Sequence, residues 1–217
     1  MNKEVQFYWE SLGQHYNIDP NKKYLFYYPG CFCPPHRCHF NTINDFTYLS
    51  NAKFFIHQGG RQGRHGVPYD LTRKIWKIYI KELLPVDRYV LIGRRSHSNQ
   101  VKDLCKHPFT QEADVIVFIA GNENYDPIEM ERSVRDNKYK KRFDGLIGEG
   151  KEIVFLYLDR PTNGVSATKF SAAVKKYSYL PYRSKRKYEK LSPFLPEGLS
   201  DKAVRYIIRK LSECDLK

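Results

Sequence analysis

The sequence concentrates groups that can bind a metal ion or a phosphate in one short stretch near its N-terminus. Residues 30–40 read GCFCPPHRCHF and hold three cysteines and two histidines. Thiolates and imidazoles are the usual ligands of zinc, whereas imidazoles and backbone N–H groups at the start of a helix can bind phosphate oxygens. The chemistry of this stretch is therefore that of a metal centre or of an anion site.

A zinc site would have to be built from Cys31, Cys33, His36, Cys38 and His39 alone. Structural zinc sites normally take two ligands from each of two separated chain segments, because a tetrahedron has to be enclosed from more than one side. No matching pair of ligands follows elsewhere in the sequence. The spacing therefore favours phosphate over zinc, and no protein-bound metal is predicted.

The phosphate interpretation accounts for more of the stretch. Gly30 follows an apolar run and lets the backbone turn sharply, and Pro34 and Pro35 stiffen the loop. His36 and His39 are three residues apart, which places them on one face of the first turn of a helix. Two imidazoles and several backbone N–H groups at the positive end of a helix would attract a triphosphate.

Short apolar runs surround this stretch and predict the strands that position it. These runs are rich in β-branched and aromatic residues, which is typical of buried strands. They cover residues 24–28, 52–57, 89–93, 114–121 and 152–158. Segments with helical character lie between and after them, at 39–49, 69–84, 97–106, about 127–139, 166–176 and 200–214. In the second segment Leu71, Ile75, Ile78 and Leu83 are expected to form one apolar face.

The alternation of buried strands with helices predicts the architecture. Parallel strands need crossover connections, so this order favours a Rossmann-like three-layer α/β/α fold with about five parallel strands. In such sheets the ligand binds at the carboxyl ends of the strands. GCFCPPHRCHF lies there, directly after the first predicted strand.

The stretch resembles the G-x-F-x-P-x-H-x-G-H signature of the nucleotidylyltransferase superfamily, which includes nicotinamide mononucleotide, pantetheine-phosphate and glycerol-phosphate transferases. A second segment, VSATKFS at Val165–Ser171, is similar to the I-S-x-T-x-x-R motif that follows the last sheet strand in that superfamily. The resemblance extends over about residues 23–174. The sequence departs from the family pattern at Cys38, where the family has Gly, and at Ser171, where the family has Arg.

The resemblance implies a nucleotidyltransferase that moves a nucleoside monophosphate from ATP, or from CTP, to a phosphorylated acceptor and releases pyrophosphate. Nicotinamide or nicotinate mononucleotide is the acceptor expected from the family. His36 and His39 would contact the triphosphate and the transition state, and Lys169 would add positive charge. Mg²⁺ would arrive with the triphosphate, because the sequence shows no dedicated carboxylate cage.

The same resemblance implies a set of nucleotide-binding residues. They are Gly30, Cys31, Phe32, Cys38, Gly121, Ser166 and Thr168. The acceptor phosphate would be bound by Arg61 and Arg64, in the glycine-rich loop after the second predicted strand, and by Arg94 after the third. A flexible surface loop and solvated arginines are the alternative interpretation of those positions.

Composition limits the class of protein and of partner. The 217 residues include 37 Lys+Arg and 24 Asp+Glu, a net charge of +13, which favours an anionic partner. No apolar run approaches the roughly 18 residues of a membrane span, and no signal-peptide core is present. Five cysteines in this spacing do not indicate a disulfide framework. A soluble cytoplasmic protein with no membrane partner is expected.

Three parts are predicted along the chain. Residues 1–22 form a helical lead-in, 23–176 the nucleotidyltransferase-like α/β domain, and 177–217 a basic helical extension of the same domain. Within 175–190 lysines and arginines alternate with tyrosines. Such a segment is typical of a solvated basic helix, but it can also bind RNA through phosphate contacts and base stacking. A catalytically degenerate nucleotide- or RNA-binding protein on the same fold is therefore the alternative function.

Overall fold

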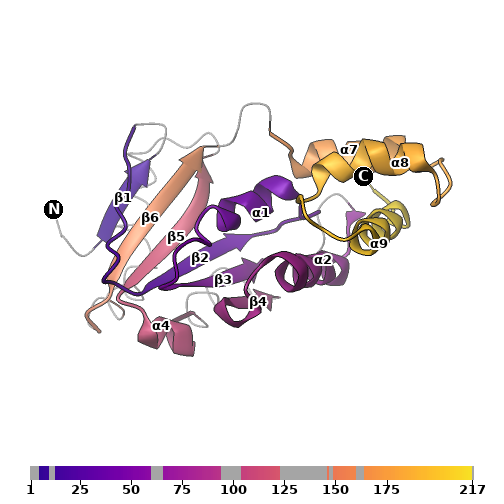
Figure 1. The fold of residues 1–217 in the computed structure, drawn as a ribbon. Coiled ribbons are helices and arrows are strands. Elements are labelled where there is room, and N and C mark those ends of the chain that lie inside the picture. The colour runs from indigo at the N-terminus through magenta and orange to yellow at the C-terminus, as the bar shows by residue number, and fades with distance from the viewer. Residues whose placement is uncertain are drawn as a thin grey trace. The chain divides into compact units, whose positions relative to one another are not determined.

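The computed structural model describes residues 5–9, 13–59, 66–93, 104–122, 146, 149–159 and 164–216. Its strands form a six-stranded sheet in the order β1-β6-β5-β2-β3-β4 (Figure 1). They are β1 (Val5–Trp9), β2 (Tyr24–Gly30), β3 (Ala52–Gln58), β4 (Tyr89–Gly93), β5 (Val115–Asn122) and β6 (Glu152–Asp159). The pairs β1–β6, β5–β6 and β2–β5 run parallel. The predicted Rossmann-like α/β class and all five predicted strands are confirmed.

The described helices follow the predicted order. They are α1 (Arg37–Asn44), α2 (Tyr69–Leu83), α4 (Pro108–Glu112), α7 (Ala167–Lys176), α8 (Lys185–Leu191) and α9 (Asp201–Ser212), with two 3₁₀ helices, η3 (Val86–Arg88) and η4 (Ser192–Phe194). Helix α1 begins two residues earlier and ends five earlier than expected for 39–49. The helix expected at about 127–139, and most of that at 97–106, lie outside the described residues.

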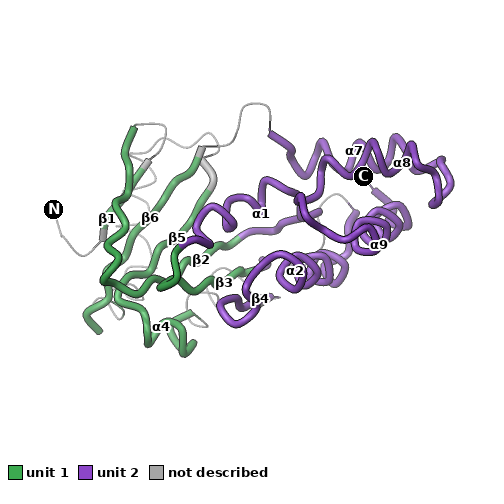
Figure 2. The backbone as a smooth tube through the Cα atoms, in the orientation of Figure 1, with its two compact units in different colours: residues 1–29, 49–57, 95–162 green, residues 30–48, 58–94, 163–217 purple. Residues whose placement is uncertain are grey.

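The chain forms two compact units (Figure 2). Unit 1 comprises residues 1–29, 49–57 and 95–162, and unit 2 comprises 30–48, 58–94 and 163–217. Both motifs that carry the family resemblance, 30–40 and 165–171, therefore belong to unit 2.

An aromatic row crosses the strands of unit 1 in register. Phe7 of β1 is paired with Phe155 of β6, Phe155 with Phe118 of β5, and Phe118 with Tyr27 of β2. The ring centroids of these successive pairs are 5.1, 5.0 and 5.1 Å apart. Aromatic pairs at such separations contribute about 0.5–1.5 kcal/mol beyond the area that they bury. A slip by one residue would move every ring to the other face of the sheet, so the row helps to fix the register.

The helical lead-in predicted for residues 1–22 is wrong at Val5–Trp9, which form β1. This strand pairs with β6 along its whole length, and Gln6 Nε2 donates a hydrogen bond to Glu152 Oε1 at 3.0 Å. A five-residue run rich in aromatics has no periodicity that separates a strand from a helix. Pairing with a strand some 150 residues later in the chain, as in Val5 with Ile153, decides its conformation.

The buried face of α2 also differs from the expected one. Its buried residues are Tyr69, Thr72, Ile75, Trp76, Tyr79 and Ile80. Of the predicted face only Ile75 is buried, whereas Leu71, Ile78 and Leu83 are partly exposed. Thr72 and Tyr79 can be buried because their hydroxyl groups have hydrogen-bond partners in the loop after β2.

Helices α7, α8 and α9 pack together at the end of the chain, orange to yellow in Figure 1, and α9 also contacts α2. The rings of Phe170 and Phe194 stack with centroids 5.0 Å apart. The Ser200 backbone N–H and hydroxyl both donate to the Glu82 carboxylate, at 2.9 and 3.1 Å, so the start of α9 is attached to α2. None of the helices in the described part of the chain is both long enough and apolar enough to cross a membrane.

The start of α4 predicts a pH dependence of stability. His107 Nδ1 accepts a hydrogen bond from the Phe109 N–H at 3.2 Å, and burial, followed by the charge of Lys53, lowers the pKa of His107. Below the ordinary value of 6.5 the unfolded chain therefore binds more protons than the folded one, so the free energy of unfolding decreases as the pH falls through this window. Protonation removes the acceptor, and a lost N-cap costs about 1 kcal/mol.

The variant His107→Asn keeps an N-cap acceptor that does not titrate. We expect urea unfolding to show the wild type losing about 1 kcal/mol more stability than His107→Asn between pH 7.5 and pH 5. An equal loss in both proteins would contradict this role of His107.

Candidate functional site

The candidate site is the loop of residues 31–36, which connects β2 to α1. Gly30 ends β2, and its carbonyl accepts a hydrogen bond from the Gly59 N–H at 2.8 Å. Phe32 has φ 49°, in the left-handed region that residues other than glycine rarely adopt. This conformation turns its ring back over Gly30, where an added Cβ would lie 2.6 Å from the ring. A side chain at position 30 would therefore displace the Phe32 ring.

One face of α2 holds this loop in place. Thr72, Trp76 and Tyr79 are four and three residues apart and so point to the same side of the helix. Their contacts join Thr72 Oγ1 to Cys33 Sγ at 3.3 Å, the Trp76 ring to the Phe32 ring at 5.3 Å between centroids, and the Tyr79 hydroxyl to the Pro35 carbonyl oxygen at 3.1 Å. Sequence reasoning missed these positioning residues, although their spacing on a predicted helix was the available signal.

The two imidazoles lie together at the start of α1, as their spacing predicted. His36 is the N-cap residue and is 3% exposed, and the ring centroids of His36 and His39 are 3.7 Å apart with 27° between the ring planes. The Phe32 ring packs edge-on against His39 at 5.1 Å. The imidazole pair is therefore packed into the same cluster that fixes the loop.

The electrostatics at this point favour an anion. The His36 side chain makes no capping hydrogen bond to α1, and the first turn of α1 contains no acidic residue. The backbone N–H groups of a first turn carry the positive end of the helix dipole. A phosphate placed there would meet helix N–H groups and imidazoles together.

The thiols of the loop are engaged in packing. Cys33 donates to the Cys31 carbonyl oxygen at 3.1 Å, and Cys38 is half-buried in the first turn of α1. None of the five cysteines forms a disulfide. Within the described ranges, no three His, Cys, Asp or Glu side chains are grouped so that they could hold a metal ion.

The second motif forms the start of α7. Ser166 is the N-cap residue, and its Oγ accepts a hydrogen bond from the Lys169 N–H at 3.1 Å. Thr168 and Lys169 are exposed in the first turn, and Lys169 Nζ donates to the Gly164 carbonyl oxygen at 3.3 Å. The first turn contains no acidic residue. Like α1, this helix therefore begins with a first turn that contains no carboxylate to compete with an anion.

Ser171 stands at the arginine position of the motif, and this position is buried. It is 3% exposed, on the buried side of α7 with Phe170 and Val174. Its hydroxyl has no hydrogen-bond partner among the described residues. An arginine at this position would bury its charge instead of reaching a phosphate.

The structure does not test the remaining predicted site residues. Arg61, Arg64 and Arg94 lie outside the described residues. Gly121 is part of β5, where it is paired with Leu158, and belongs to unit 1. Their roles stay predictions.

Comparison with known proteins indicates the fold. No protein-family model matches the chain, and no curated protein matches it in sequence. Among solved structures, one from Vibrio parahaemolyticus, assigned as a nicotinate-nucleotide adenylyltransferase, superposes with a TM-score of 0.51 at 11% identity, over 86% of this chain and 99% of that one. The nicotinic acid mononucleotide adenylyltransferase of Plasmodium falciparum, complexed with NaAD, gives 0.47 at 11% identity, over 90% and 100% of the two chains. Thermotoga maritima TmcAL bound with α-thio ATP gives 0.49 at 13% identity, over 87% and 55%.

The Vibrio structure shows that this chain has the same fold over nearly the full length of that protein. The Rossmann-like α/β fold expected from the sequence is thereby confirmed.

The burial of Ser171 predicts opposite effects for two substitutions. Ser171→Ala should raise the free energy of unfolding by up to about 1 kcal/mol, because it removes a buried hydroxyl without a partner and improves helix propensity. Ser171→Arg should lower it by about 3 kcal/mol or more, because it buries a charge.

Urea unfolding of both variants measures these changes. Ala172→Arg, at an exposed position of the same helix, is the matched control and should stay within about 0.5 kcal/mol of the wild type. If Ser171→Arg proved as stable as Ala172→Arg, the arginine would be able to leave the core, and our assignment of this face of α7 would be wrong.

Proposed function

We propose that this chain is a nucleotidyltransferase that transfers AMP from ATP to nicotinamide or nicotinate mononucleotide and releases pyrophosphate. CTP is the second choice of donor. The observation that supports the proposal most strongly is the stacked His36–His39 pair at the N-terminus of α1, whose first turn contains no acidic residue. The shared fold adds support at the level of architecture.

The reaction needs positioning and charge stabilisation more than covalent chemistry. An oxygen of the acceptor phosphate attacks the α-phosphorus of ATP, and the bond from that phosphorus to the oxygen bridging to the β-phosphate breaks. Negative charge builds on the α-phosphate oxygens and on the departing pyrophosphate. Preorganised donors aimed at that charge lower the barrier without forming an intermediate on the protein.

In this proposal the loop and α1 bind the triphosphate. The first-turn N–H groups of α1 and the imidazoles of His36 and His39 would contact its oxygens. Tyr79 and Trp76 would act as positioning residues, because they fix the loop through Pro35 and Phe32 and touch no reacting atom. A donor held rigidly before the substrate arrives costs no reorganisation when charge develops.

Helix α7 would hold the departing phosphates. Thr168 is exposed at the N-terminus of α7, and the Ser166 hydroxyl can still donate its proton while its oxygen caps the helix. Lys169 would have to leave the Gly164 carbonyl, a long surface contact of 3.3 Å that costs little to break. Mg²⁺ would enter with the triphosphate as part of the substrate and would offset its negative charge.

Cys38 is the departure from the family pattern that concerns the nucleotide directly. Its half-buried thiol stands where the family has glycine, so we propose that it narrows the approach of the ribose or base to the backbone of α1. Gly121 and the arginines 61, 64 and 94 complete the proposal as nucleotide and acceptor contacts.

A catalytically degenerate nucleotide-binding protein is the second candidate. It is favoured by one observation. The position of the arginine in the second motif is occupied by Ser171 and is buried, so no side chain at this position reaches a phosphate.

Pyrophosphate release tests the proposed function. The purified protein, with Mg²⁺, is assayed with ATP or CTP against nicotinamide mononucleotide, nicotinate mononucleotide, phosphopantetheine and glycerol 3-phosphate. We expect release with one pair, and a loss of about 100-fold or more in kcat for His36→Asn and for His39→Gln, because a neutral amide group in a different position does not replace the imidazole at the transition state. Asn is a favourable N-cap residue, so His36→Asn should retain α1.

His15→Gln, an exposed histidine outside the site, is the matched control and should keep full activity. Release that is equal in all three variants would contradict the role of the imidazole pair. Binding of ATP without release for any pair would favour the degenerate binding protein.

A further inference from the structure

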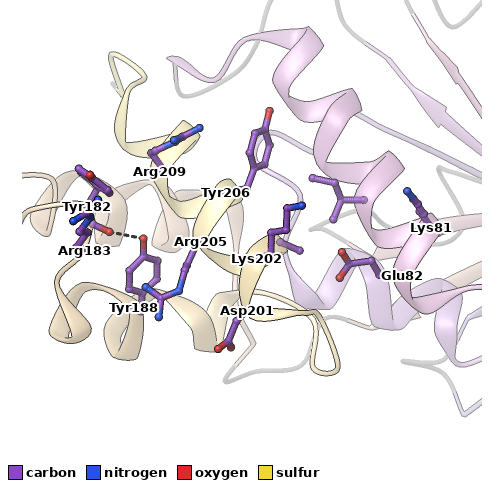
Figure 3. Close-up of a pocket in the computed structure, with 12 residues that line it drawn as sticks. Lys81, Glu82, Tyr182, Arg183, Tyr188, Asp201, Lys202, Arg205, Tyr206 and Arg209 are labelled. Atoms are coloured by element: carbon purple, nitrogen blue, oxygen red, sulfur yellow. Dashed lines mark hydrogen bonds between the residues drawn. The ribbon is translucent and has the colours of Figure 1, made fainter.

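A groove of about 910 Å³ lies in unit 2, lined by residues of α2, α8, α9 and the segment before α8 (Figure 3). None of its lining residues belongs to the loop 31–36 or to the start of α7. It is therefore separate from the candidate active site, and the inference drawn from it does not rest on the proposed function.

The charges around this groove are predominantly positive. Five cationic side chains line it, from Lys81, Arg183, Lys202, Arg205 and Arg209, against two acidic ones, from Glu82 and Asp201. The Glu82 carboxylate is already engaged by Ser200, and Arg209 has Glu213 at 3.7 Å. In the described part of the chain no carboxylate forms an ion pair with Arg183 or Arg205. A net positive groove in which these two guanidinium groups have no carboxylate partner among the described residues fits an anionic ligand.

The cations on α9 form a stripe. Lys202, Arg205 and Arg209 are three and four residues apart, so they lie on one side of the helix. Like charges at these spacings destabilise a helix by roughly 0.2–0.5 kcal/mol per pair. Phosphate groups bound along α9 would be attracted to these three cations and would offset the repulsion between them.

Aromatic rings lie beneath the guanidinium groups. The Arg205 guanidinium lies 4.8 Å from the centroid of the Tyr188 ring, and that of Arg183 lies 5.3 Å from the Tyr182 ring. Tyr182 is 54% exposed although it is a large aromatic residue. Unpaired nucleic-acid bases stack on aromatic rings, and a neighbouring guanidinium group adds a cation–π contribution. An acidic peptide would use the charges of the groove but not these rings.

The segment that carries Tyr182 and Arg183 is fixed before any ligand binds. Lys187 is 2% exposed, and its Nζ donates to the carbonyl oxygens of Leu180 at 3.1 Å and of Ser178 at 3.4 Å. The Tyr188 hydroxyl donates to the Tyr182 carbonyl oxygen, the dashed line in Figure 3. Preorganisation of this kind removes part of the entropy cost of binding.

We infer that this groove binds single-stranded nucleic acid, with phosphates along Lys202, Arg205 and Arg209 and a base stacked at Tyr182. Duplexes are excluded as the preferred ligand because their bases are already stacked and present no free ring face. RNA and DNA strands share the chemistry that the groove recognises.

Fluorescence anisotropy with labelled 12-residue oligouridylate and oligothymidylate tests this inference, at 50–250 mM KCl. A hairpin duplex and a 12-residue polyglutamate peptide are the comparison probes. We expect both single strands to bind more tightly than the duplex and the peptide, whichever sugar is preferred. Tyr182→Ala should weaken binding about 5- to 150-fold, the range for loss of one stacked base, while Tyr182→Phe keeps the ring and the affinity.

The double variant Arg205→Gln/Arg209→Gln should reduce the slope of log Kd against log salt by about 0.7 for each phosphate that is no longer neutralised. Lys23→Gln/Lys106→Gln removes the same charge from exposed positions of unit 1 and is the matched control. Peptide or duplex binding as tight as that of the single strands would overturn the inference, and so would equal slopes in the two double variants or undiminished affinity in Tyr182→Ala.

Discussion

The packing of Phe32 is the constraint on which the candidate active site depends. Its left-handed backbone costs about 1–3 kcal/mol for a residue other than glycine. Burial of its ring against His39 and Trp76 returns about 1.5–3 kcal/mol, so the two effects nearly balance. The conformation persists because Gly30 leaves space for the ring and α2 holds the loop through Tyr79. The Phe32 ring thereby packs against His39, which is stacked on His36 at the start of α1.

Unit 2 would then bind phosphates by two different physical means. In the loop after β2 and at the start of α7, the donors are backbone N–H groups and short side chains held in place by the fold. In the groove beside α9 they are guanidinium groups over tyrosine rings, where charge and stacking act together. The first arrangement suits one compact triphosphate whose reaction must be positioned, and the second suits an extended chain. The net charge of +13 is consistent with both.

Features that depend on neighbouring residues of the chain could be predicted from the sequence, whereas features that depend on packing between distant segments could not. Buried strands of a parallel sheet are apolar throughout, so the five runs could be recognised locally. The His36–His39 pair was predicted because a spacing of three is a local property of a helix. The burial of Ser171 was missed, because motif position does not determine which side of a helix packs. The groove was missed for a related reason: α2, α8 and α9 are far apart in the sequence, and only the basic, tyrosine-rich composition of 175–190 indicated a part of it.

The most direct test of the account is an NMR titration of the histidine ring resonances with a non-hydrolysable ATP analogue and Mg²⁺, assigned with His36→Asn and His39→Gln. The account predicts that the His36 and His39 signals shift together and saturate at the same analogue concentration, while those of His15 and His107 do not move. If calorimetry showed that the analogue binds and both signals stayed unchanged, the triphosphate would bind elsewhere and the central claim would be wrong.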